Sequence, residues 1–102
     1  MPLCFLLFDR AETADGHAAL EGLASTGPSQ HAAMMAEVQQ VLDWAHQAFP
    51  HGPGPLDEGH DWDHDLQVRD EPGGWRTVTL TLAASAAFAQ AFEVAFPTDE
   101  GA

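Results

Sequence analysis

The sequence changes its hydrophobic period once between residues 75 and 96, and this change constrains the fold more than any other feature. Apolar residues at every second position from 78 to 82 alternate with threonines, which is the pattern of a strand with one buried face. After Ser85, three phenylalanines follow at four-residue spacing, so they share one stripe of an amphipathic helix. We therefore predict a strand over residues 75–82 that runs into a helix ending before Pro97.

The N-terminal part of the chain is harder to interpret. Residues 3–8 (LCFLLF) form an unbroken apolar run, and this length is typical of a strand covered on both faces. Residues 9–27 contain apolar positions that suit a short helix, but Gly16 and Gly22 weaken it. We predict a loop there with at most one helical turn, although loops of this length are uncommon in small domains.

Three further elements are clear in the middle of the chain. Residues 28–49 carry a stripe of apolar side chains at helical spacing, and Pro50 ends that helix. Residues 50–61 hold three prolines and three glycines, which predicts a loop. Residues 62–69 alternate like a half-buried strand, and the Pro-Gly-Gly turn that follows joins them to residues 75–82 as a hairpin.

The order strand, helix, strand, strand, helix indicates a small α+β fold of the βαββα type. A right-handed crossover joins residues 3–8 to 62–69, and we expect the strand at 75–82 to insert between them. The result is a three-stranded antiparallel sheet in the order 1-3-2, with two helices on one face. In topology it resembles half of a ferredoxin-like unit that lacks its fourth strand. We expect one domain over residues 1–97 and a flexible acidic tail over 98–102.

Charge is the strongest indication of function. Sixteen Asp and Glu residues face three basic side chains, all of them arginine, which gives a formal net charge of −13. Such a field repels DNA, RNA and anionic lipid, because phosphate binding requires clustered Lys or Arg. We therefore expect no nucleic-acid partner and no membrane partner, whereas a basic protein would be attracted. The alternative is that the acids serve only solubility.

Cysteine usage and hydropathy indicate a location for the protein. Cys4 is the only cysteine, so a disulfide within the chain is excluded. The short apolar N-terminal run has no basic residue before it, unlike a signal peptide, and no apolar run has the length of a transmembrane helix. These features predict a cytoplasmic protein.

A histidine- and aspartate-rich segment follows the proline-rich loop and is the candidate for a metal site. His60, Asp61 and His64 offer ligand atoms that zinc or nickel accepts. The resemblance to a zinc-protease motif fails because that motif requires a helix, and the residues that follow alternate like a strand. A calcium loop would require glycine and glutamate where the chain has Leu66 and Pro72. A weak metal or small-ligand site remains as an alternative, and we predict no resident cofactor.

No catalytic constellation stands out in the sequence. Ser25, Ser29 and Ser85 occupy positions typical of caps and turns, and glycine-rich phosphate loops are absent. The paired carboxylates lie in predicted turns, not in a dry cleft that would raise the pKa of one of them. An enzyme is therefore possible but unsupported, and a non-catalytic protein is favoured.

A protein partner is the leading hypothesis, and two surfaces are candidates for binding it. The first combines acids with two tryptophans, namely Asp57, Glu58, Asp61, Trp62, Asp63, Asp65 and Trp75. We expect mutual repulsion to raise the carboxylate pKa values of these acids and their neighbours up to Glu71. The second surface is the first strand, where Cys4, Leu6 and Phe8 would form an apolar interface at an exposed edge. A second copy of the chain covering that strand would make a homodimer.

These features lead to three functional hypotheses. The first is a small acidic protein-binding module of bacterial type that occupies a basic partner, as immunity proteins, antitoxins and nucleic-acid mimics do. The second is a domain that binds a metal or small ligand through His60, His64 and the neighbouring acids. The third is a non-catalytic protein whose role is self-association.

Overall fold

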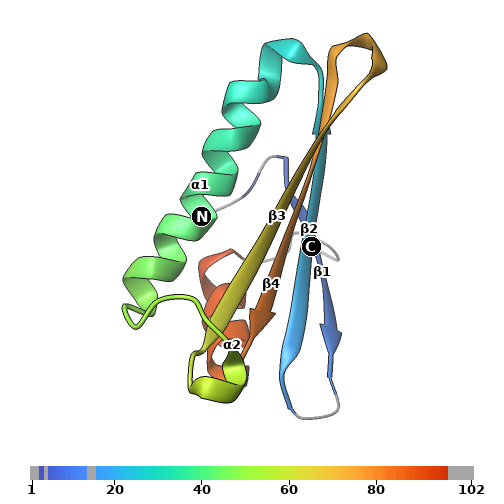
Figure 1. The fold of residues 1–102 in the computed structure, drawn as a ribbon. Coiled ribbons are helices and arrows are strands. Elements are labelled where there is room, and N and C mark those ends of the chain that lie inside the picture. The colour runs from blue at the N-terminus through green and yellow to red at the C-terminus, as the bar shows by residue number, and fades with distance from the viewer. Residues whose placement is uncertain (1–2, 4, 14–15, 97–102) are drawn as a thin grey trace.

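A computed structural model of the protein describes residues 3, 5–13 and 16–96, which form one sheet and two α-helices. The elements in chain order are β1 (Leu7–Glu12), β2 (Ala18–Thr26), α1 (His31–Ala48), β3 (Trp62–Glu71), β4 (Trp75–Ala84) and α2 (Ala86–Ala95). The sheet is antiparallel, its four strands lie in the order β1-β2-β4-β3, and both helices cover the same face (Figure 1). The predicted α+β class is confirmed.

The predicted three-stranded sheet in the order 1-3-2 is wrong, because the sheet contains a fourth strand. Most of residues 9–27, which were expected to form a loop, belong to a hairpin of β1 and β2. Every second residue of β2 is buried, but most of these positions hold alanine or glycine, which have little strand preference. Packing explains the glycine, since a Cβ atom on Gly22 would lie 2.6 Å from Cζ of Phe8.

β4 inserts between two strands, as predicted, but β2 takes the place that was expected for residues 3–8. β2 and β3 both run antiparallel to β4, so they are parallel to each other, and α1 forms the crossover between them. This arrangement is a split βαβ unit. β1 pairs with the outer edge of β2 and fills the position where a fourth strand was expected to be missing.

The core lies between the sheet and the helices and is built from the predicted apolar stripes. Its largest fully buried side chains are Trp62, Phe88, Met34, Leu80, Leu82, Val41 and Val78. Trp44 connects the two helices, because its ring centroid lies 5.3 Å from that of Phe88 and 5.4 Å from that of Phe96. In the described ranges, neither helix has the length and apolarity needed to cross a membrane.

Glu37 of α1 holds the segment that precedes β1. One oxygen of this buried carboxylate accepts hydrogen bonds from the backbone amides of Phe5 and Leu6, at 2.9 and 2.7 Å. Leu6 is buried, and Phe5 packs against the margin of the core. Cys4 and the predicted tail over residues 98–102 lie outside the described residues.

Candidate functional site

The face of the sheet that points away from the helices carries a row of acidic side chains across its middle. The strand register places Asp9, Glu21, Thr81 and Asp65 side by side, one residue from each strand. The three carboxylates are exposed, and the spacing of neighbouring strands gives the row a length of about 14 Å. We call this surface the open face, and these three acids with Thr81 the acidic row.

Few bulky side chains flank the acidic row. On one side, the next row across the sheet consists of three alanines and Asp63. On the other side it consists of Leu7, Leu23, Thr79 and Gln67, with the two leucines opposite each other. The open face therefore presents negative charge at its centre and a small apolar contact beside it.

Charge on the open face is poorly compensated. Asp9 and Glu21 lie directly opposite each other in the β1–β2 ladder, and like charges in that position destabilise a sheet. Arg10 and Arg76 lie on the helix side of their strands, where carboxylates pair with them. Arg69 is the arginine whose strand position places it on the open face, at the outer edge on β3.

Of the residues predicted to bind a partner, three lie on the open face. Asp63 and Asp65 lie there on β3, and the exposed Trp75 lies at the start of β4. Asp57 and Glu58 are exposed elsewhere, in a 3₁₀ turn that precedes β3. The sequence did not reveal Asp9 and Glu21 as members of this surface, because their positions depend on the unpredicted β1–β2 hairpin.

The two remaining residues of that predicted surface have structural roles. Trp62 is fully buried, with its ring stacked on Phe88 at a centroid distance of 5.6 Å, so it is not available to a partner. Asp61 accepts a hydrogen bond from the Ser85 hydroxyl at 2.9 Å. The Ser85 oxygen in turn accepts from the backbone amide of Phe88, which caps α2. Asp61 therefore orients a helix cap.

The histidines of the alternative metal site do not converge. Nδ1 of His60 lies 3.0 Å from the Gly52 carbonyl oxygen, and its ring stacks on His51 with centroids 4.4 Å apart. His64 is exposed on β3, beside the ring of Trp62. Within the described residues, no group of three or more His, Cys, Asp or Glu side chains is placed to hold a metal ion. The geometry therefore gives the metal alternative no support.

Two of the predicted interface residues of the first strand, Leu6 and Phe8, point toward the core. Leu6 is buried, and Phe8 packs edge-on against the ring of Phe92 at a centroid distance of 4.9 Å. Their outward-facing neighbour is Leu7, which is 78% exposed. β1 is an edge strand, but it begins at Leu7, so the strand predicted over residues 3–8 is wrong except at its last two residues. Leu6 and Phe8, which were expected on its outer surface, are used inside the protein. A homodimer through this strand stays a prediction that now depends on Leu7.

At Asp70, near the end of β3, the expectation that repulsion raises the carboxylate pKa is wrong. A hydrogen bond from Nε of Arg76, at 2.8 Å, lowers the pKa of Asp70 below its ordinary value of 3.8. Arg76 lies opposite Asp70 in the β3–β4 ladder, so the hairpin itself brings the two together.

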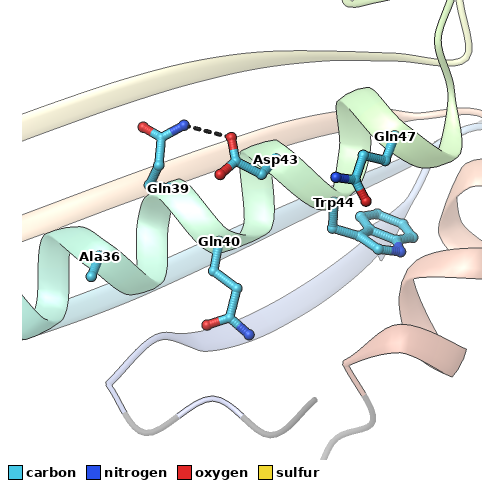
Figure 2. Close-up of a pocket in the computed structure, with 6 residues that line it drawn as sticks. All are labelled: Ala36, Gln39, Gln40, Asp43, Trp44 and Gln47. Atoms are coloured by element: carbon cyan, nitrogen blue, oxygen red, sulfur yellow. Dashed lines mark hydrogen bonds between the residues drawn. The ribbon is translucent and has the colours of Figure 1, made fainter.

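A shallow hollow of about 470 Å³ follows the outer surface of α1 (Figure 2). It is lined by Ala36, Gln39, Gln40, Asp43, Trp44 and Gln47. Gln39 donates a hydrogen bond to Asp43 at 2.8 Å, whereas Gln40 and Trp44 project from the other side of the helix. This lining offers amide and aromatic contacts, but it contains no nucleophile paired with a base.

The sequence analysis singled out none of the residues that line this hollow, and Trp44 is the largest of them. A second shallow hollow, of about 460 Å³, lies on its other side and extends along α2. In the sequence, Trp44 lies three residues after Val41, at the margin of the apolar helical stripe. This position is the feature that marks it as a residue that packs beside the core. Trp44 serves to pack α1 against α2, with the two hollows as the spaces left beside its ring.

Neither a protein-family model, nor a curated protein, nor a solved structure matches the chain. The candidate site is therefore defined by the geometry of this molecule. The open face has exposed charge and an extended surface, which suit binding to a macromolecule better than they suit the enclosure of a small substrate.

Proposed function

We propose that this protein is a small protein-binding module that occupies a basic surface of a partner through the open face of its sheet. The observation that carries the proposal is the acidic row, in which Asp9 and Glu21 are directly opposed. Departures from the rules of local stability concentrate at functional sites, and a Lys or Arg side chain of a partner would relieve this repulsion. The net charge of −13 would also steer a basic partner toward the molecule.

The side chains around the acidic row support the same proposal. Thr79 and Thr81 are short and polar, so cationic side chains of a partner could reach the carboxylates between them. Leu7 and Leu23 provide an apolar contact next to the charges. Complementary charge raises association rates and specificity, whereas apolar contacts slow dissociation, so the two features have complementary roles.

Two triple variants with the same net charge test the proposal. The first, Asp9→Asn/Glu21→Gln/Asp65→Asn, neutralises the acidic row, and the control, Asp43→Asn/Asp57→Asn/Glu58→Gln, neutralises three exposed acids elsewhere. The probe is a synthetic peptide of alternating lysine and threonine, titrated calorimetrically at an ionic strength of about 0.15 M.

The first variant should bind the peptide roughly tenfold more weakly than the wild type, because each exposed ion pair contributes about 0.2–1 kcal/mol. The control should bind nearly as well as the wild type. Equal weakening in both variants would mean that the peptide responds to net charge alone, and the open face would then not be the binding site.

A further inference from the structure

β3 is the long edge strand of the sheet, and its backbone groups point alternately toward β4 and away from it. The Trp62 carbonyl oxygen accepts a hydrogen bond from the Gly54 amide at 3.0 Å, so the backbone groups of Trp62 point away from β4. The β3–β4 register is regular, so the groups of residues 64, 66, 68 and 70 point the same way. Because the loop containing Gly54 occupies the edge at Trp62, the accessible edge covers residues 63–71.

We propose that two copies of the chain pair through this edge as antiparallel strands, with a twofold axis at Gln67. In that register, Leu66 lies opposite Val68 of the second copy. Asp65 likewise lies opposite Arg69 of the second copy. Each pairing occurs twice, because a twofold interface uses the same surface on both copies. The edge thus matches apolar with apolar residues and acid with base.

Backbone geometry and charge disfavour the neighbouring registers. The backbone groups of β3 that point away from β4 must pair with the same kind of groups in the second copy. The twofold axis therefore has to pass through a residue and not between two residues. An axis at Asp65 would place this carboxylate against its own copy. An axis at Val68 would oppose Asp65 to Glu71, and axes nearer the strand ends would shorten the paired segment.

An axis at Leu66 is the remaining competitor, and the loop next to β3 disfavours it. That register would extend the pairing to Trp62, whose carbonyl group is already bonded to the Gly54 amide. The register centred on Gln67 starts at Asp63 and therefore uses only the accessible edge.

Arg69 provides an independent reason for this pairing. Arg10 and Arg76 each contact a carboxylate, whereas Arg69 has no carboxylate partner within the described part of the chain. In the paired edge, Asp65 and Arg69 of the second copy occupy a position without backbone hydrogen bonds, where side chains of opposed residues are closest. Opposite charges at such a position stabilise the ladder.

The apolar residues of the edge give a second reason. Leu66 and Val68 are 37% and 45% exposed, although they lie on the helix side of the sheet. Their ladder partners on β4, Leu80 and Val78, are fully buried. Pairing would cover the exposed members of this row and would leave the helices of both copies on one face of a continuous sheet.

Two local interactions oppose the pairing, and both lie toward the ends of the segment. The Asp63 carboxylate accepts a hydrogen bond from the His64 amide at 2.9 Å, and this bond would be replaced by a carbonyl group of the second copy. Asp63 and Glu71 would be opposed as like charges at the outermost position. The proposal does not rest on binding of a basic partner. Asp65 takes part in both surfaces, whereas Asp9 and Glu21 of the acidic row stay uncovered in the dimer.

A charge exchange at two positions tests the register by sedimentation equilibrium. Asp65→Arg and Arg69→Asp, as single variants, should each raise the dimer dissociation constant roughly tenfold, because two ion pairs become two repulsive pairs. The double variant should restore the wild-type value. Asp65→Arg is especially informative, because it removes two units of negative charge from a chain of −13 and should strengthen association if only net charge mattered.

Cross-linking at the twofold axis gives a second measurement. Opposed residues without backbone hydrogen bonds have Cα atoms about 4.5 Å apart, a distance that a disulfide spans. Gln67→Cys in a Cys4→Ser background should therefore form a disulfide-linked dimer on mild oxidation. Leu7→Cys in the same background is the matched control on the other edge and should cross-link much less. A monomeric wild type, a double variant without recovery, or preferential cross-linking of the control would each overturn the proposal.

Discussion

The two edges of the sheet differ in how far they are integrated into the protein. β1 has six residues and β3 has ten, yet the shorter strand and the segment before it contact both helices, because Arg10 pairs with Glu93 of α2 and Glu37 belongs to α1. Glu37 binds two backbone amides just before β1, and Phe8 covers Gly22. β3 is fixed at its start, where Trp62 is buried, and every residue from position 64 to its end is exposed.

This difference indicates which edge is available for association. Exposed edge strands are commonly protected by short length, by charge or by proline. β1 is short and turns its aromatic side chain inward. β3 is long, and its charged residues Asp65 and Arg69 are of opposite sign, so they attract a matching strand where uniform charge would repel one. Charge on β3 therefore favours self-pairing at Asp65 and Arg69 and opposes it only at the ends of the segment, at Asp63 and Glu71.

The largest effect is expected at the buried start of β3. Trp62→Ala should lower the free energy of unfolding by about 3–5 kcal/mol, because the whole indole is buried and leaves a cavity. Val68→Ala, on the same face of the strand, should change it by less than about 0.5 kcal/mol. Urea denaturation at low protein concentration, where a dimer dissociates, measures both values. Similar losses in the two variants would contradict the division of β3 into a buried and an exposed part.

A smaller effect is expected where α1 holds the start of β1. Glu37→Ala should lower the free energy of unfolding by about 1–3 kcal/mol, because the amides of Phe5 and Leu6 lose their acceptor in a poorly hydrated place. Glu37→Gln keeps an acceptor oxygen and should lose less. Chemical denaturation measures the stability, and amide exchange at Leu6 reports the local release. If both variants lose the same amount, the negative charge matters and not the acceptor.

The elements that could be predicted from the sequence are those that contain residue types with a strong local structural preference. The phenylalanine stripe of α2, the proline that ends α1 and the turn between β3 and β4 are all local signals. β2 could not be recognised in this way, because a strand that buries alanine and glycine looks like a weak helix or a loop. What makes Gly22 suitable for a strand is the ring of Phe8, which arrives from another strand.

The same limit applies to the candidate site. Asp63, Asp65 and Trp75 were identified from composition and alternation, and they do lie on the open face. Asp9 and Glu21 became part of the acidic row only through the β1–β2 register, which no local pattern encodes. Trp62 fits the strand pattern equally well, but its burial depends on helices that pack over one end of β3.

The smallest effect is expected from the ion pair between Asp70, near the exposed end of β3, and Arg76 of β4. The Arg76 hydrogen bond lowers the pKa of Asp70, so the folded state binds this proton less tightly than the unfolded chain does. The resulting stabilisation is present above the ordinary pKa of 3.8 and is lost as the pH falls through the lower folded-state value. Arg76→Gln should therefore reduce the melting temperature slightly at neutral pH in low salt, and the difference from the wild type should disappear in acid. A difference that persists in acid would show that Arg76 stabilises the end of β3 by packing, and the exposed part of this edge would then be more firmly held than its accessibility suggests.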